Sequence, residues 1–251
     1  MKKLLFQSVF FLSGVIVVAQ ERLSADRPDA SEGATLTPKR YFQAEFGLGA
    51  VNINDDDFYI THPDALFKYG VSKRFELQFI AEYLSLYEKY IPSTKTTRGF
   101  TPCMIGFRTA LWEQKKIIPK TSVIVRAGFP FLASKDFKPE HVQSVVLLTM
   151  ENEITDKISF GYNVGPAWDG FDTTPGWFYS FSSQFDLGKR WDSFLEVFGS
   201  AQKNAMPQNV IDAGLGFYIN SDLKLDGYFG FGITNDSPKN LFGVGFSFRF
   251  H

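Results

Sequence analysis

The chain of 251 residues contains one cysteine, three histidines and little net charge, with a formal value of −1. Because Cys103 is alone, the chain has no internal disulfide. The near-neutral balance offers no cationic surface, so nucleic acid is excluded as an expected partner. After residue 18 the longest purely apolar run is Val145 to Leu148, whereas a membrane-spanning helix needs about 20 residues. Any membrane insertion of this chain must therefore use strands.

Aromatic residues are abundant, with 28 phenylalanines, and they alternate with small or polar residues. The last ten residues before His251 read LFGVGFSFRF. Successive strand side chains point to opposite faces. One face of this segment is wholly apolar and comprises Phe242, Val244, Phe246, Phe248 and Phe250. Such an amphipathic strand is typical of bacterial outer-membrane barrels.

Segments of this kind recur along the chain with no convincing helix between them. Twelve strands are predicted near residues 41–50, 63–70, 75–84, 101–112, 121–131, 144–154, 158–166, 176–187, 193–201, 209–218, 223–233 and 240–250. Short connections alternate with longer ones such as 51–62, 85–100 and 132–143, which is the asymmetry of outer-membrane barrels. We therefore predict an all-β, transmembrane, antiparallel up-and-down β-barrel of about 12 strands, with Trp112, Trp191, Tyr41, Tyr69 and Tyr218 in interfacial girdles. The alternative is a secreted soluble sandwich or calyx with the same alternation inverted.

The N-terminus has the pattern of a secretory signal. Lys2 and Lys3 precede an apolar run, and small residues at Val17 and Ala19 favour cleavage before Gln20. We expect residues 1–19 to be a cleaved signal peptide, residues 20–40 a periplasmic or lumenal segment, and residues 41–251 the barrel. The bacterial outer membrane is the expected location.

The polar face of the predicted strands supplies the candidate pore residues. They are Gln43, Glu45, Glu76, Gln78, Glu82, Arg108, Arg126, Glu196, Asp212, Lys224, Asp226 and Arg249. These side chains form either a selective constriction or a structural network that fills the barrel. Strand number does not decide between the two, because eight-stranded barrels are filled by side chains and 16-stranded barrels leave a channel. Four Gly-x-Gly pairs on this face, beginning at residues 47, 214, 230 and 243, predict a smooth sector or relieve strain where the sheet bends.

Residues 25–47 and 63–79 carry a family resemblance. The matching residues are Asp26, Arg27 and Pro28, then Gln43 and Glu45, then Tyr69, Gly70, Glu76, Leu77 and Gln78, and FLEVFGS at 194–200 fits the same pattern. The chain resembles the outer-membrane transporter family of the phenol-degradation meta pathway. The resemblance implies a bacterial β-barrel with a transport role. The Asp26, Arg27, Pro28 and Asp29 stretch is either a flexible lead or a segment folded into the lumen, with Arg27 pairing Glu45 or Glu76.

The function predicted from these patterns is passive uptake of small molecules through an outer-membrane channel, and the resemblance extends this to hydrophobic or aromatic ones. The alternative is a closed barrel with a structural or surface-interaction role. Expected partners are outer-membrane lipid, the barrel-assembly machinery and a small-molecule solute. No enzyme is predicted, because His62 and His141 lie in predicted loops and His251 at the terminus, without a nucleophile motif. No cofactor or metal is expected: Asp55, Asp56 and Asp57 near His62 offer oxygen ligands of the kind that divalent cations take, but a run of acids in a loop is usually solvated.

Overall fold

The computed structural model describes residues 22–90 and 93–251, and the signal peptide prediction lies outside them. The strands are β1 (Phe42–Asn52), β2 (Phe58–Ser72), β3 (Phe75–Tyr90), β4 (Ser93–Phe100), β5 (Met104–Trp112), β6 (Lys120–Gly128), β7 (Gln143–Thr155), β8 (Ile158–Trp168), β9 (Gly176–Asp186), β10 (Trp191–Gln202), β11 (Gln208–Asn220), β12 (Leu223–Gly232) and β13 (Asn240–Phe250). Two short 3-10 helices, η1 (Pro130–Leu132) and η2 (Lys135–Phe137), precede β7. Within the described ranges no helix is long and apolar enough to cross a membrane.

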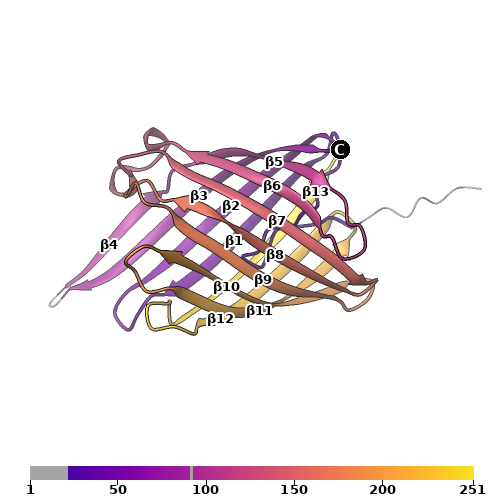
Figure 1. The fold of residues 1–251 in the computed structure, drawn as a ribbon. Helices are drawn as coiled ribbons and strands as arrows, with labels where there is room; N and C mark the ends of the chain where they lie inside the picture. Colours follow the sequence, from indigo (N-terminus) through magenta and orange to yellow (C-terminus); the bar gives the residue numbers. More distant parts are fainter. Residues whose placement is uncertain (1–21, 91–92) are drawn as a thin grey trace, which may run out of the picture.

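Each strand pairs antiparallel with its neighbours, and the sheet closes on itself (Figure 1). Closure occurs between the first and last strands, from Phe42 opposite Phe250 to Asn52 opposite Asn240. Strand β3 pairs with β5 through residues 75–80 and with β4 through residues 83–90. Because β4 and β5 share one place beside β3, the closed barrel has twelve strand positions, as the alternation predicted.

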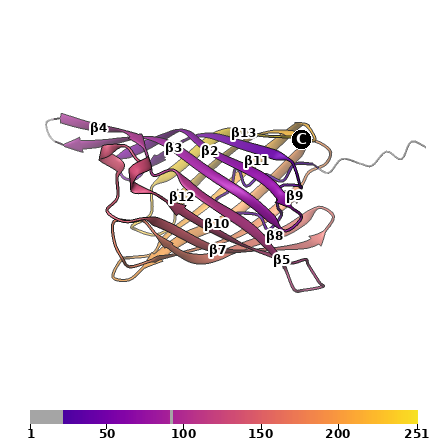
Figure 2. The ribbon, with the colours of Figure 1, turned by 90° about the horizontal axis from the view of Figure 1, so that it is seen from above.

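The difference from prediction lies beside this shared place. The sequence predicts a loop over residues 85–100, but residues 85–90 continue β3 and residues 93–100 form β4. Strand β2 also begins earlier than expected, at Phe58. Together these strands extend the wall into a hairpin that projects beyond the rest of the barrel (Figure 2). Alternation is weak over residues 85–100, which is why sequence reasoning missed the hairpin.

The orientation of the two strand faces separates the barrel from the soluble alternative. Outward-facing apolar side chains are widely exposed, for example Phe242 at 49% and Val244 at 59%. Charged side chains point inward, and Arg108 and Glu196 are each 0% exposed. A soluble barrel has the reverse arrangement, because it buries its apolar face. The soluble sandwich is therefore wrong for this chain.

The two ends of the barrel differ. The short-turn end carries the turns 73–74, 156–157, 187–190 and 221–222, one longer connection at 113–119, and the C-terminus, and the long-loop end carries 129–142, 169–175, 203–207 and 233–239. Among the predicted girdle residues, Trp112 and Trp191 are 50% and 47% exposed. Tyr218 was expected there but is 8% exposed, because it shares the inward face of β11 with Asp212.

Candidate functional site

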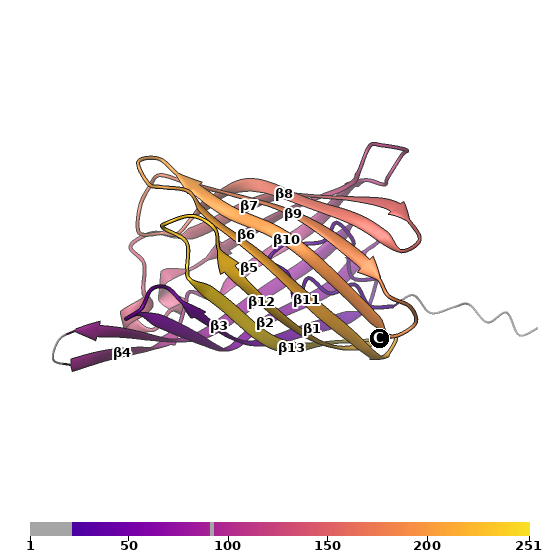
Figure 3. The same cartoon turned by 90° about the horizontal axis from the view of Figure 1, so that it is seen from below.

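The lumen contains residues 22–40, here called the N-terminal segment. This segment lies inside the barrel near the short-turn end (Figures 1 and 3). Its first part is tied to that end by a hydrogen bond from the Leu23 amide to the Ser221 carbonyl at 2.8 Å. Its last part returns there, where the Arg40 amide donates to the Gly70 carbonyl at 2.6 Å. The middle of the segment crosses the lumen between these anchors.

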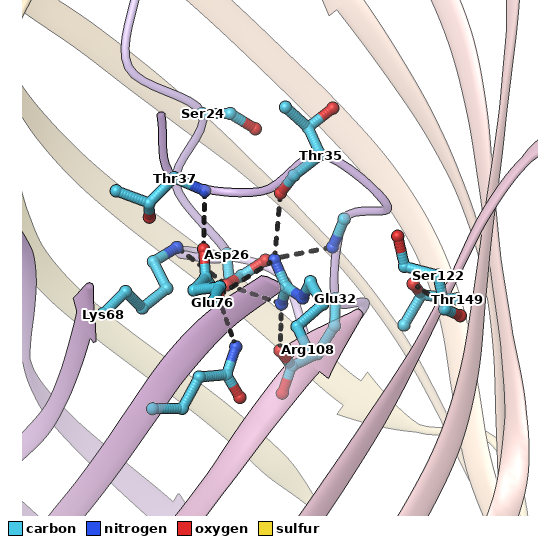
Figure 4. Close-up of polar contacts among 12 residues, drawn as sticks. Ser24, Asp26, Glu32, Thr35, Thr37, Lys68, Glu76, Arg108, Ser122 and Thr149 are labelled. Carbon is cyan, nitrogen blue, oxygen red and sulfur yellow. Dashed lines mark hydrogen bonds and ion pairs between the residues drawn. The ribbon is translucent and has the colours of Figure 1, made fainter. Parts of the chain in front are cut away.

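Asp26 lies at the centre of a network of hydrogen bonds and ion pairs between the N-terminal segment and the barrel wall (Figure 4). Its Oδ2 accepts from Lys68 Nζ at 2.8 Å and from Arg108 Nη2 at 2.9 Å. Lys68 is 1% and Arg108 is 0% exposed. Burial raises the pKa of Asp26, but the charges of Arg108 and Lys68 outweigh it, so the pKa lies below its ordinary value of 3.8. Asp26 is therefore a buried, ionised anchor.

Carboxylates and cations alternate around this anchor. Glu32 of the segment accepts from Arg108 Nη2 at 2.7 Å and from Arg126 Nη2 at 2.7 Å. The wall residue Glu76 accepts the amide of Thr37 at 2.5 Å. Buried charges are tolerable only when they are paired and hydrogen-bonded. The network meets that condition by combining segment acids with wall cations.

Arg27 attaches the segment to the opposite side of the network. Its Nη1 donates to Asp64 Oδ2 at 3.1 Å and its Nη2 to Asp226 Oδ1 at 3.2 Å. Only its backbone amide contacts Glu45, at 3.0 Å. The guanidinium lies over Gly47 and Gly245, which face each other across β1 and β13, and a Cβ at either position would collide with it. Two of the predicted Gly-x-Gly pairs thus provide space for Arg27.

The next residues reach the far wall. Glu196 of β10 accepts the Ala30 amide at 2.7 Å and also the Ser31 hydroxyl. Ser31 Oγ is 2.6 Å from Ser180 Oγ of β9. Between these contacts and Arg27 lies Asp29. Burial, and then the charge of Glu196, raise the pKa of Asp29 well above 3.8.

All twelve predicted pore residues lie on the inward side of the wall, but not all meet the segment. Gln43 donates to the Ser24 carbonyl at 2.8 Å, and Gln78 accepts from Arg126 at 2.8 Å. Lys224 pairs with Asp192 at 2.8 Å. Two of them have other partners near the two ends: Glu82 accepts from Thr61 and Thr101, and Arg249 pairs with Asp222.

Cavities lie on both sides of the N-terminal segment. The outer cavity, toward the long-loop end, has a volume of about 500 Å³. Its walls include the apolar or aromatic residues Val51, Tyr59, Leu66, Ile80, Phe178, Phe198, Val210, Tyr228 and Leu241. The inner cavity, toward the short-turn end, has about 320 Å³ and is lined largely by polar residues. Arg27, Pro28 and Asp29 line both cavities, so this stretch is the partition between them.

Sequence reasoning missed two parts of this site. Lys68, which binds Asp26 and Glu45, lies in a strand whose alternation a register shift near Asp64 interrupts. The apolar lining of the outer cavity is also beyond the prediction, which describes the inward face as mostly small or polar. The signal was available in Phe178, Phe198 and Tyr228, which share strand phase with Ser180, Glu196 and Asp226.

The acidic loop at Asp55 to Asp57 forms hydrogen bonds with its own surroundings. Lys89 pairs with Asp56 at 2.6 Å, and Asn54 donates to Asp57 at 2.9 Å. Across the part of the chain that the structure describes, no group of three or more His, Cys, Asp or Glu residues is arranged to hold a metal ion.

Comparisons with solved structures identify the fold. An outer membrane channel from Pseudomonas putida F1 matches with a TM-score of 0.69 and 9% identity, covering 90% of this chain and all of that one. The KdgM porin matches with a TM-score of 0.55 and 11% identity, over 83% and 99% of the two chains. The CymD monoaromatic hydrocarbon channel matches with a TM-score of 0.51 and 9% identity, over 86% and 90%. The fold of this chain is therefore that of outer-membrane barrel channels.

The comparison with curated protein sequences gave no match. A family model does match, from residue 25 to residue 250, and it begins at the segment that crosses the lumen. This range contains the Asp26, Arg27 and Pro28 stretch and every strand of the barrel. The chain belongs to the family described as "Putative MetA-pathway of phenol degradation".

Proposed function

We propose that this protein is a channel of the bacterial outer membrane through which small apolar or aromatic molecules diffuse passively. The observation that carries the proposal is the outer cavity, which is large enough for one aromatic ring and is lined by Phe178, Phe198 and Tyr228. An aromatic lining favours apolar solutes because their transfer from water removes apolar surface from contact with it. The family and the fold support the same function.

The exterior of the barrel fits this location. Its exposed apolar side chains would contact outer-membrane lipid, and a closed sheet leaves no unpaired edge in the hydrocarbon. The last strand, β13, which alternates strictly and ends at Phe250, is the expected recognition element for the barrel-assembly machinery. Residues 1–19 would direct the chain to export.

In this function the N-terminal segment sets the width of the path. Arg27, Pro28 and Asp29 separate the two cavities, so a solute crosses only when this partition yields or leaves a narrow way past it. Diffusion suffices, because the sequence contains no nucleotide-binding motif to drive transport.

The experiment is a planar-bilayer measurement on the refolded barrel, both intact and beginning at Tyr41. Ohmic current steps are expected from the intact protein, and larger steps from the shortened one, because removing the segment joins the two cavities. Benzyl alcohol added at the long-loop side should reduce the current of both forms by occupying the outer cavity. Correctly folded barrels that remain silent in both forms would contradict the proposal.

A closed barrel with a surface-interaction role is the second candidate, and the projecting hairpin favours it. Phe58 and Tyr87 stack there with their ring centroids 4.5 Å apart, and Phe100 is 46% exposed. Replacing Tyr87 and Phe100 by serine should reduce cell-surface binding under this candidate. Under the channel proposal the same change leaves the bilayer current intact.

A further inference from the structure

The outer cavity has apolar walls but an acidic floor. Its lining includes six carboxylates, from Asp26, Asp29, Glu32, Glu45, Asp64 and Asp212, and one guanidinium, from Arg27. A purely apolar solute can form neither hydrogen bonds nor ion pairs with these carboxylates. An acid that lacks a cation partner marks the place where a cationic ligand would bind.

Four of these six acids form ion pairs with cations of the barrel wall or of the N-terminal segment. Asp26 and Glu45 pair with Lys68, and Glu32 pairs with Arg108 and Arg126. Asp64 pairs with Arg27. Asp29 and Asp212 differ, since no ion pair joins either of them to a cation among the described residues, and of the two Asp29 accepts from Gln184 at 3.4 Å.

Asp212 is also closely enclosed. It is 4% exposed, and its Oδ1 has no hydrogen-bond partner within the described chain. Its neighbour across β10 and β11 is another acid, Glu196, which shares a side-chain hydrogen bond with Asp212 and also accepts two hydrogen bonds from the N-terminal segment. A buried acceptor without a donor costs free energy that a ligand donor can recover.

The strand register places aromatic rings on both sides of Asp212. Phe198 faces Val210 on one neighbouring strand, so it lies diagonal to Asp212. Tyr228 faces Gly214 on the other, so it is diagonal too. Gly230, directly opposite Asp212, adds no side chain between them. Diagonal cross-strand neighbours are within reach of aromatic side chains, and both rings line the outer cavity.

We propose that the outer cavity is a binding site for a small organic cation with an apolar body, an amine whose ammonium group lies against Asp212 between Phe198 and Tyr228. The carboxylate accepts the ammonium hydrogen bond, and the ring faces attract its charge. The apolar walls above hold the body of the ligand. This proposal names a class of solute for the proposed channel, and it rests on the proposed channel function for the passage of that solute. Binding of the solute is measured separately from its passage.

The test is titration calorimetry of the full-length protein in detergent micelles at pH 7, with micelles alone subtracted. Benzylammonium, benzyl alcohol and benzoate share one body and differ in the charge of the head group. Benzylammonium is expected to bind about tenfold more tightly than benzyl alcohol, because one charged hydrogen bond and a cation–π contact are added. Benzoate is expected to bind least. Equal affinity for the three would overturn the proposal.

Asp212→Asn should lower the affinity for benzylammonium to that for benzyl alcohol and leave benzyl alcohol unchanged. Asp236→Asn is the matched control, because Asp236 is an exposed acid in the loop after β12. It should change neither affinity. If Asp212→Asn does not refold, Phe198→Leu takes its place and should weaken benzylammonium several-fold relative to benzyl alcohol. An unchanged benzylammonium affinity in a folded variant overturns the site.

Binding and conduction separate the two proposals. Charge-selective binding by a barrel that is silent in the bilayer would keep the site and remove the channel. Conduction together with equal binding of the three probes would keep the channel and remove the cation site.

Discussion

The inner and outer halves of the lumen are built from the same strands but hold different contents. In the inner half, charged wall residues such as Lys68 and Arg108 are 1% and 0% exposed and bind the N-terminal segment. In the outer half, Phe178, Phe198 and Tyr228 line open space. The inner half is crossed by the protein's own chain and keeps a polar cavity of about 320 Å³, whereas the outer half keeps a cavity of about 500 Å³ with aromatic walls.

The comparison shows that one alternating pattern serves two purposes. Charges inside a narrow barrel need partners at close distance, and the segment provides Asp26 and Glu32 for them. Apolar rings need no such partners, so the outer half can remain unfilled. Stability is therefore concentrated near the short-turn end, while the capacity to bind a solute is concentrated near the long-loop end.

The largest effect is expected from Arg108→Met in the inner half. Arg108 binds Asp26 and Glu32 and lies 4.0 Å from Glu76. Removing one partner of a buried ion pair typically costs about 3–5 kcal/mol, because the remaining charges stay buried and unpaired. Urea unfolding in micelles should show this loss of stability. Arg98→Met, in the projecting hairpin, is the control. An equal loss of stability in that variant would contradict the claim that stability is concentrated near the short-turn end.

A smaller effect with a distinctive pH dependence is expected from the two segment acids. Docking lowers the pKa of Asp26, so its contribution is present above its ordinary pKa of 3.8 and is lost as the pH falls below that value. Docking raises the pKa of Asp29, so its contribution is present below 3.8 and is lost as the pH rises through the raised value. The segment should therefore loosen both in strong acid and toward alkaline pH.

Asp26→Asn should release the segment at neutral pH, since it removes two charged hydrogen bonds worth about 1.5–3 kcal/mol each. Asp29→Asn should keep the segment docked and remove the alkaline loosening. Bilayer current from about pH 2 to pH 9 measures both, because release joins the two cavities. The same pH profile in both variants would mean that the two acids do not act as described.

The smallest effect on stability is expected in the outer half. Phe178→Leu keeps an apolar side chain of similar volume, and such changes usually cost less than about 1.5 kcal/mol. The same variant should weaken the current block by benzyl alcohol, because it removes one ring from the cavity wall. Phe171→Leu, at an exposed loop position, is the control. A large loss of stability in Phe178→Leu would remove the distinction between the halves.

The sequence predicted the barrel because alternation is a local property that each strand carries by itself. Phe242 and Arg249 can be assigned to opposite faces from their spacing alone. The partners of Arg27 could not be assigned, because Asp64 and Asp226 are brought together only by the closure of β2, β1, β13 and β12. Strand β4, at residues 93–100, could not be predicted for a related reason. Its residues alternate weakly, and the strand forms by pairing with β3.

The long sequence separation of the segment contacts has a consequence for how the protein folds. Arg27 and Asp226 are 199 positions apart, and Ala30 and Glu196 are 166 apart. Contacts of this range form late, because loop closure must precede them. The segment is synthesised before the strands, yet its binding partners exist together only after the last strands have joined the first. Resistance of residues 22–40 to protease would thus report completed assembly, and a barrel arrested one strand short would be cut there.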